Sequence, residues 1–289
     1  MNLNSSLDYQ PPLAWEALTG FLVSRSDGMS QGLIGQRYVR TLRMGAISGW
    51  IAARPVAGST LEIEVSSSLR PSLAELRPLL CQLFDLDANP PVIDRHLATD
   101  PALAPLVQRQ PGLRLPGSVD GFELALRAIL GQQISVKAAT TLFRRMVEAF
   151  GDEVVTPFPD INRLPPKAEV VAGLPSQALL DLGITRRRAD TIIGLARVMA
   201  AGDLVLSPAA NPELCRQQLL ALPGIGPWTA NYVSMRALAD PDAFPQADLG
   251  LLRGMKADNP AHLEALSQRW RPWRAYAAFH IWHALGQGG

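Results

Sequence analysis

Residues 222–230 read LPGIGPWTA, and this stretch predicts two helices joined by a tight glycine turn. Gly224 and Gly226 flank one apolar residue, so the backbone can adopt positive φ and its N–H groups can point outward with no Cβ in the way. Pro227 suits the first turn of the second helix, where its missing N–H costs no hydrogen bond. Ile225 can anchor the turn in the core. Because N–H groups beside the positive end of a helix favour phosphate, the stretch is interpreted as a phosphate-binding hairpin, with a plain helical connector as the alternative.

The chain around this hairpin is predicted to be helical. Asp120 and Ser135 are typical caps for two helices that precede it, and Gly151 is expected to end the second of them. Further helices are predicted over 177–182, 186–201, 212–221, 228–238 and 261–283. No segment after residue 115 strongly favours a strand.

The first ninety residues carry strand patterns instead. Apolar and polar residues alternate over 61–66, and the segments 38–44 and 47–53 flank Gly45-Ala46, which predicts a hairpin. A helix over 12–23 is expected before these strands, and a helix that begins with a capping box of Ser72 and Glu75 is expected after them. We therefore predict an α+β amino-terminal domain over 1–95, followed by a helical region over 96–289.

Composition limits the classes of function. With 289 residues, of which 47% are hydrophobic, the chain has room for one large or two modest globular domains. Cys81 and Cys215 cannot build a disulfide framework or a four-cysteine metal site, which fits a reducing compartment. No signal peptide is visible, and prolines and glycines interrupt the uncharged stretch 217–235, which therefore does not predict a membrane span. A net charge of +1 excludes bulk attraction to nucleic acid, so any such contact must be local.

Motifs that occur together in one known family run through nearly the whole chain. They are GFL at 20–22, FDL at 84–86 with NP at 89–90, the connector 109–117, RAILGQ at 127–132, the hairpin 222–233, Asp248, RWRPWR at 269–274 and HIW at 280–282. With these motifs the chain resembles the helix-hairpin-helix superfamily of DNA base-excision glycosylases, and within it the branch that repairs alkylated DNA. The resemblance implies an all-α region of two helical subdomains flanking a cleft, with bounds of about 118–238 for one and 96–117 plus 239–289 for the other.

By this resemblance Asp248 is the catalytic residue. Breaking an N-glycosidic bond leaves a sugar with oxocarbenium character, which a carboxylate in a low-dielectric cleft stabilises better than water does. The same carboxylate could position or deprotonate the attacking water. Taken alone, the local sequence also predicts that Asp248 caps a helix beginning at Leu249, and the two roles are compatible.

Chemistry on a base in duplex DNA requires that the nucleotide leave the stack and enter a pocket of flat side chains. Trp228 and Tyr232 are four residues apart on one predicted helix and share a face. Alkylated purines carry positive charge, which electron-rich rings attract. For Trp270 and Trp273, packing in the core is the favoured interpretation. By resemblance the residues that bind the base are Phe21, Trp228, Tyr232, Leu249 and Trp282, although the family pattern has tyrosine where this chain has Leu249.

The resemblance also assigns contacts with DNA. Gln133 takes the place of the side chain that wedges into the gap left by the extruded base, where the best-known family pattern has leucine; an ordinary loop residue is the alternative. The backbone contacts fall on Gly224, Ile225, Gly226 and Thr229. The run Arg186 to Arg188 opposes the dipole of its helix, which phosphate contact could offset, although a solvated face is the commoner explanation for such a run.

The resulting hypothesis is a monofunctional glycosylase that excises alkylated purines such as 3-methyladenine and 7-methylguanine. A bifunctional glycosylase-lyase of this superfamily uses a lysine at the position of Trp228, and the only lysines are Lys137, Lys167 and Lys256. A non-catalytic DNA-binding module is the remaining alternative, and the presence of Asp248 disfavours it. No cofactor or iron–sulfur cluster is implied, although the hairpin carbonyls could hold a monovalent cation. The expected partner is double-stranded DNA with alkylated bases, bound by a monomer in the bacterial cytoplasm, at the nucleoid.

Overall fold

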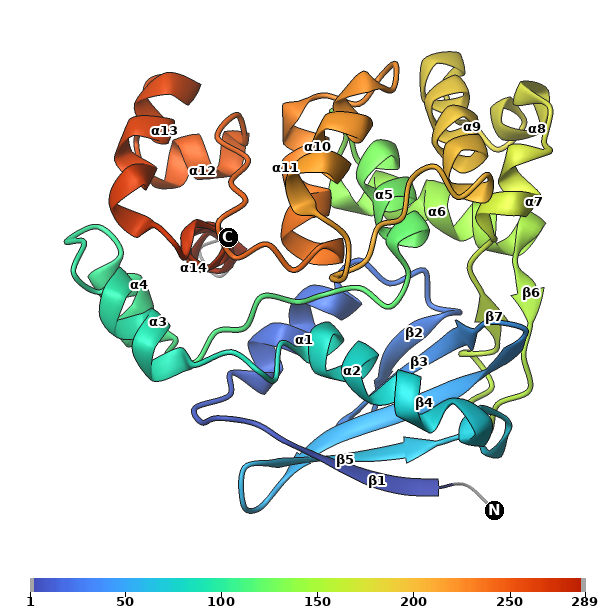
Figure 1. The fold of residues 1–289 in the computed structure, drawn as a ribbon, viewed down its shortest axis with the longest axis horizontal. Helices are drawn as coiled ribbons and strands as arrows, with labels where there is room; N and C mark the ends of the chain where they lie inside the picture. The colour runs from blue at the N-terminus through green and yellow to red at the C-terminus, as the bar shows by residue number, and fades with distance from the viewer. Residues whose placement is uncertain (1–2, 287–289) are drawn as a thin grey trace.

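The amino-terminal part of the chain forms an antiparallel sheet at one end of the molecule (Figure 1). The structure is a computed structural model that describes residues 3–286. Its strands are β1 Leu3–Asp8, β2 Gln31–Ile34, β3 Arg37–Met44, β4 Ile47–Val56 and β5 Thr60–Val65, and they lie in the order β1-β5-β4-β3-β2. Met44 pairs with Ile47, so Gly45-Ala46 forms the turn, as predicted. Alternate residues of β5 (Leu61, Ile63 and Val65) are buried, which confirms the predicted strand pattern.

Helices α1 (Trp15–Val23) and α2 (Leu73–Phe84) pack on this sheet through their leucines. Helix α1 begins three residues later than predicted, because the carbonyl of Gly112 accepts a hydrogen bond from Ala14 N and Arg114 binds the carbonyl of Pro12. The predicted capping box of α2 does not form. A 3₁₀ helix, η1 (Ser67–Ser72), leads directly into α2, and its last residue makes no side-chain capping bond.

The remainder is helical, as predicted, apart from one short pair of strands. The helices are α3 Pro90–Leu97, α4 Ala104–Arg109, α5 Gly121–Leu130, α6 Val136–Phe150, α7 Ala168–Ala172, α8 Ser176–Leu180, α9 Arg186–Ala200, α10 Pro212–Ala221, α11 Pro227–Ala237, α12 Leu249–Gly254, α13 Pro260–Ser267 and α14 Arg274–Gly286. Asp120 accepts hydrogen bonds from Phe122 N and Glu123 N, and Ser135 accepts one from Ala138 N, so both predicted caps form. Over residues 3–286, none of the helices has the length and apolar character that crossing a membrane requires.

Two segments of this region differ from the prediction. Strands β6 (Asp152–Glu153) and β7 (Arg163–Leu164) pair with each other, and two-residue strands are too short to leave a periodic signal. The single helix predicted over 261–283 is divided into α13, the 3₁₀ helix η2 (Gln268–Trp270) and α14. The division falls at Pro272, whose missing N–H and fixed φ do not suit a helix interior.

Two separate cores hold the helical region together, and Figure 1 shows the two groups of helices side by side above the sheet. One core takes buried residues from 122–238, and the other takes them from 93–115 and 235–281. Residue 95, the border expected from the sequence, lies inside α3, and both Ile93 and Leu97 of α3 pack in the second core. We therefore propose that the border of the amino-terminal domain lies before Pro90.

Candidate active site

A cavity of about 1130 Å³ is lined by residues of the first helical core and of the amino-terminal part of the chain, and by residues at the start of α12 and on α14. It is large enough for a nucleobase and part of its sugar. The structure brings together most of the predicted site residues, which come from distant parts of the sequence. Those that line the cavity are Gln133, Gly224, Gly226, Trp228, Thr229, Tyr232, Asp248, Leu249 and Trp282.

Asp248 lies at the start of α12 and accepts hydrogen bonds from two indoles. Its Oδ2 accepts from Trp228 Nε1 at 2.8 Å, and its Oδ1 accepts from Trp282 Nε1 at 2.9 Å. Oδ1 also accepts from Leu251 N at 2.9 Å, so Asp248 caps α12 as the local sequence predicts. These hydrogen bonds hold the carboxylate in one orientation. No Lys or Arg pairs with it within residues 3–286, so no cation neutralises its charge.

Aromatic rings form a wall beside this carboxylate. Trp228 and Tyr232 are one turn apart on α11, and their rings stack with a centroid distance of 5.1 Å and an interplanar angle of 8°. Trp282 of α14 lies 6.2 Å from Tyr232, at an angle of 59°. The wall therefore combines a flat stacked pair with a third ring from α14, which packs against both cores. Leu249 is 76% exposed, at the rim of the cavity next to Asp248.

Two predicted site residues are not among those that line the cavity. Phe21 packs against Phe279 at a centroid distance of 4.5 Å, and the guanidinium of Arg25 covers its ring at 3.6 Å. Ile225 is buried in the first core, where it anchors the hairpin, and its N–H donates to the carbonyl of Leu222 within the turn. Trp270 is fully buried and donates to Asp100, which confirms the core interpretation for that residue.

The two glycines of the hairpin have different surroundings. Gly224 has a φ of +89°, and a Cβ there would lie 2.0 Å from Thr191 Oγ1. Thr191 of α9 donates to the carbonyl of Pro223, so the hairpin is held against α9. At Gly226 a Cβ would meet nothing within 4 Å. The turn itself requires Gly224, whereas Gly226 leaves open surface beside the start of α11.

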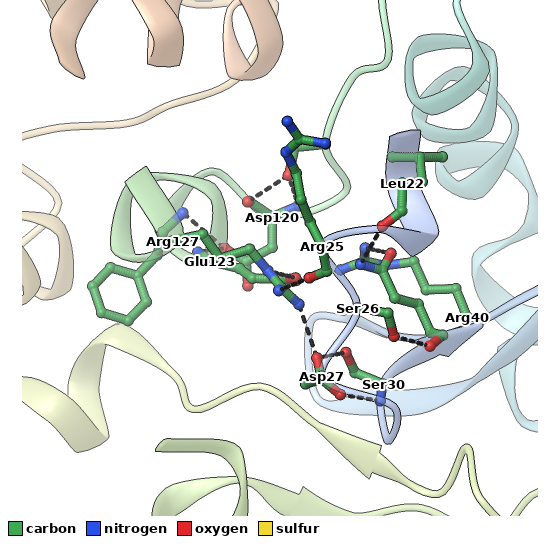
Figure 2. A network of polar contacts seen from close by, with 12 residues as sticks. Leu22, Arg25, Ser26, Asp27, Ser30, Arg40, Asp120, Glu123 and Arg127 are labelled. Carbon is green, nitrogen blue, oxygen red and sulfur yellow. Dashed lines mark hydrogen bonds and ion pairs between the residues drawn. The ribbon is translucent and has the colours of Figure 1, made fainter. Parts of the chain in front are cut away.

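A buried network of charges, shown in Figure 2, has no counterpart among the sequence predictions. Arg127 of α5 donates to Asp27 and to Glu123, both at 2.8 Å, and to the carbonyl of Arg25 at 2.6 Å. Arg40 of β3 pairs with the same Glu123. The network fastens the loop after α1 and strand β3 of the sheet to α5. Its members are up to 102 residues apart, and apart from Glu123 and Arg127, which are one turn apart on α5, no local pattern indicates that they meet.

Arginines also surround the inner end of the aromatic wall. Arg236 donates to the Tyr232 hydroxyl at 2.8 Å, and Arg25 and Arg236 both line the cavity. Burial lowers the pKa of Arg25. Burial alone would raise the pKa of Tyr232, but the neighbouring charges of Arg236 and Arg25 outweigh it and lower that pKa. The cavity is therefore lined by the guanidinium groups of Arg25 and Arg236 near Tyr232, as well as by the carboxylate of Asp248.

The loop between α5 and α6 carries the expected wedge. Gln133 is exposed and has a φ of +58°, in the left-handed region that few non-glycine residues adopt. Arg188 of α9 donates to the carbonyl of Gln132. Within the described chain, Arg186 and Arg187 are exposed and have no ion pair, and Arg187 lines the cavity. In residues 3–286 no group of three or more His, Cys, Asp or Glu side chains is placed to hold a metal ion.

Comparison with known proteins gives matches over nearly the whole chain. Residues 4–120 match the family described as AlkA N-terminal domain, and residues 126–272 match the HhH-GPD superfamily base excision DNA repair proteins. DNA-3-methyladenine glycosylase 2 of Escherichia coli is 36% identical over 282 residues, which cover 97% of each chain. A probable bifunctional transcriptional activator/DNA repair enzyme AlkA of Mycobacterium tuberculosis is 39% identical over 96% of this chain and 56% of its own length.

Solved structures share the fold. The 3-methyladenine DNA-glycosylase from Archaeoglobus fulgidus superposes with a TM-score of 0.87 at 23% identity, over 99% of both chains. An 8-oxoguanine glycosylase/lyase from Clostridium acetobutylicum superposes with a TM-score of 0.74 at 14% identity, over 98% of both chains. Because proteins named as glycosylase and as glycosylase/lyase have this same fold, the fold does not decide between the two reactions.

Proposed function

Since the chain belongs to the HhH-GPD superfamily of base excision DNA repair proteins and is a DNA glycosylase of that family, we propose that it excises alkylated purines by hydrolysis, with Asp248 as its catalytic residue. The observation that carries the proposal is the carboxylate of Asp248, which two indole N–H groups orient and no cation neutralises among the described residues. The substrates are purines such as 3-methyladenine and 7-methylguanine, and the product is an abasic site.

The role of Asp248 follows from its charge. As the base leaves, the sugar acquires oxocarbenium character, and a carboxylate beside it lowers the energy of that transition state. The bonds from Trp228 and Trp282 keep the carboxylate in one orientation before the substrate arrives, so little reorganisation accompanies the reaction. An alkylated, cationic base is already weakly bonded to the sugar through its N-glycosidic bond. Its departure therefore needs no strong acid. Water completes the reaction, and Asp248 can accept its proton.

The base is received by the aromatic wall. An alkylated purine carries a positive charge, and the electron-rich faces of Trp228, Tyr232 and Trp282 attract it. Leu249 closes the rim next to Asp248 with an apolar side chain. Phe21 supports this site from behind through its contacts with Arg25, rather than by touching the base.

Hydrolysis, rather than attack by an amine, is the reaction that these residues favour. A lyase needs an amine that forms a Schiff base with the sugar. Trp228 lies at the position where the lyases of the superfamily have lysine, and its ring nitrogen donates to Asp248 and has no nucleophilic lone pair. The residues lining the cavity in the described chain include no lysine.

DNA is the partner of this family, and we assign its contacts to the hairpin and the wedge. The open backbone at Gly226 would bind phosphate, with Gly224 forming the turn that presents it. The hydroxyl of Thr229 accepts a hydrogen bond from Gln132, so we assign its contact with DNA to its backbone N–H. Gln133 would fill the gap in the stack. We propose that a monomer acts on double-stranded DNA containing alkylated bases, in the cytoplasm at the nucleoid.

The test is release of free bases from methylated DNA, identified by chromatography. We expect 3-methyladenine and 7-methylguanine in solution, and strands that stay intact until alkali cleaves the abasic product. We also expect that borohydride traps no covalent complex with the DNA. If no base were released, the proposed substrates would be wrong. If borohydride trapped a complex that disappeared when Lys137 or Lys256 was replaced, the reaction would be that of a lyase.

A further inference from the structure

Gln132 joins the wedge loop, residues 131–135, to the phosphate-binding hairpin. Its Nε2 donates to the carbonyl of Gly224 at 3.1 Å and to Thr229 Oγ1 at 3.0 Å. A carbonyl oxygen can only accept a hydrogen bond, so the bond to Gly224 fixes which end of the amide faces the hairpin. One amide proton is therefore donated to the hairpin and the other to the first turn of α11. These partners are 92 and 97 residues away in the sequence.

The main chain of Gln132 is held from another side. Its carbonyl accepts a hydrogen bond from Arg188 of α9, and Thr191 of the same helix donates to the carbonyl of Pro223 at 3.0 Å. Hydrogen bonds thus connect the wedge loop, the hairpin and α9 to one another. A shift of the hairpin cannot leave the loop unaffected while these bonds persist.

The adjacent residue needs such support. Gln133 has a φ of +58°, and a non-glycine residue in this region is strained unless its surroundings hold it there. Gln133 itself is exposed. The hydrogen bonds of Gln132 therefore fix the main chain from which the side chain of Gln133 projects.

On this basis we propose that Gln132 is a positioning residue that sets the wedge residue Gln133 relative to the hairpin, so that binding of the DNA backbone aligns Gln133 with the gap in the base stack. The inference rests on the proposed function, because it needs a DNA whose base has left the stack. Gln132 acts through Gln133 and not on the leaving base. Its replacement should therefore affect the filling of the gap, and not the chemistry at Asp248.

The first experiment measures directly whether Gln133 fills the gap in the base stack, and it does not depend on excision. A duplex carries a stable abasic-site analogue opposite 2-aminopurine, whose fluorescence reports stacking. Saturating wild-type protein is expected to change this fluorescence, because Gln133 enters the gap beside the fluorescent base. Gln132→Met, which keeps the length of the side chain but has no donor, should lose most of the change while still binding the duplex. Gln132→Asn, which keeps the amide but is one methylene shorter, should behave in the same way if the methionine variant does not fold.

The matched control is Gln177→Met on α8. This variant makes the same change of residue and loses the hydrogen bond from Gln177 Nε2 to Asp181 Oδ1, which lies on an exposed surface and does not involve the loop. The control should give the wild-type fluorescence change. If Gln132→Met and Gln132→Asn also gave the full change at saturation, the positioning role would be wrong.

The second experiment asks whether Gln132 acts through Gln133. Excision of an alkylated purine is measured in duplex and in single-stranded DNA for Gln132→Met, Gln133→Ala and the double variant. We expect a decrease of about tenfold in kcat/KM on duplex for Gln132→Met, the scale of one or two missing hydrogen bonds, with a much smaller decrease on single strands. The double variant should be no worse than Gln133→Ala. Effects that add, or that are equal on both substrates, would indicate a general structural role and overturn the proposal.

Failure of the wild type to release any base would instead contradict the proposed function, and the fluorescence experiment would still test the positioning role.

Discussion

Trp228 Nε1 donates a hydrogen bond to Asp248 Oδ2 over 2.8 Å, which joins the aromatic wall to the carboxylate. One side chain thus has two separable features, a flat ring that stacks on Tyr232 and an N–H that orients the carboxylate. A lysine at this position would bring an amine to the sugar. The indole instead brings a donor to Asp248.

Replacing Trp228 by Phe keeps a ring for stacking and removes the donor. We expect single-turnover excision to fall by roughly 10- to 100-fold, because a hydrogen bond to a charged group contributes about 1.5–3 kcal/mol. Binding of damaged DNA should change much less. Trp273→Phe is the control, because Trp273 packs on the second core and is not among the partners of Asp248. Unchanged excision by Trp228→Phe, or an equal decrease in Trp273→Phe, would show that the bond to Asp248 has no catalytic role.

The two hairpin glycines should respond differently to substitution. Gly226→Val has space for its side chain, so the protein should fold normally but keep phosphate from the backbone. Affinity for all DNA sequences should fall, and the slope of log affinity against log salt should decrease by about one for each phosphate that the hairpin no longer binds. Gly224→Ala should instead lower the melting temperature, since its φ is +89° and its Cβ would collide with Thr191. If the salt slope of Gly226→Val were unchanged, the DNA backbone would not bind at the hairpin.

Gln133→Ala should impair excision from duplex DNA more than from single strands. Only a duplex has a stack to be held open and an unpaired partner base to contact. The decrease should be modest, because an alkylated base that pairs poorly costs less to extrude. Rates on the same lesion in both forms of DNA are the measurement. Equal decreases on the two forms would count against the wedge.

His280 predicts a specific dependence of stability on pH. It is 2% exposed on α14, neither ring nitrogen has a hydrogen-bond partner among the described residues, and burial followed by the nearby His283 lowers its pKa from 6.5 to about 4. The unfolded chain binds a proton below the normal pKa, whereas the folded chain does not, so stability is lost as the pH falls from about 6.5 toward 4. The decrease in the free energy of unfolding from this group should be about 2 kcal/mol between pH 7 and pH 5.

His280→Leu should remove that part of the pH dependence. Denaturant unfolding at both pH values is compared for the variant and the wild type, since burial raises the pKa of Asp85 to about 6 and its contribution has the opposite sign in an overlapping range. The difference between the two proteins isolates His280. Identical pH dependence in both would mean that the pKa of His280 is not lowered by folding.

The features that the sequence predicts are local. The hairpin at Gly224, the caps at Asp120 and Ser135 and the strand over Leu61 to Val65 each depend on residues within one or two turns. Asp248 could be assigned two roles because its helix cap is also local, and its catalytic role came from resemblance. Such features need no knowledge of tertiary structure.

The remaining contacts depend on segments that only the fold brings together. The indoles that bind Asp248 are 20 and 34 residues away, and Arg40 reaches Glu123 across 83 residues. The partners of Gln132 are likewise distant. A run such as GQQIS predicts a loop before a capped helix, but nothing in it indicates which glutamine projects outward and which one binds the hairpin.

The central claim is that the negative charge of Asp248 drives excision, and Asp248→Asn tests it most directly. Asparagine keeps the volume of the side chain and is as good a helix cap as aspartate, so the bond from Leu251 N and the fold should persist. The measurement is release of 3-methyladenine from methylated duplex DNA under single-turnover conditions, together with affinity for the same DNA. We predict that release falls to the background rate while affinity stays close to that of the wild type. Release at a near-normal rate by Asp248→Asn would contradict the mechanism.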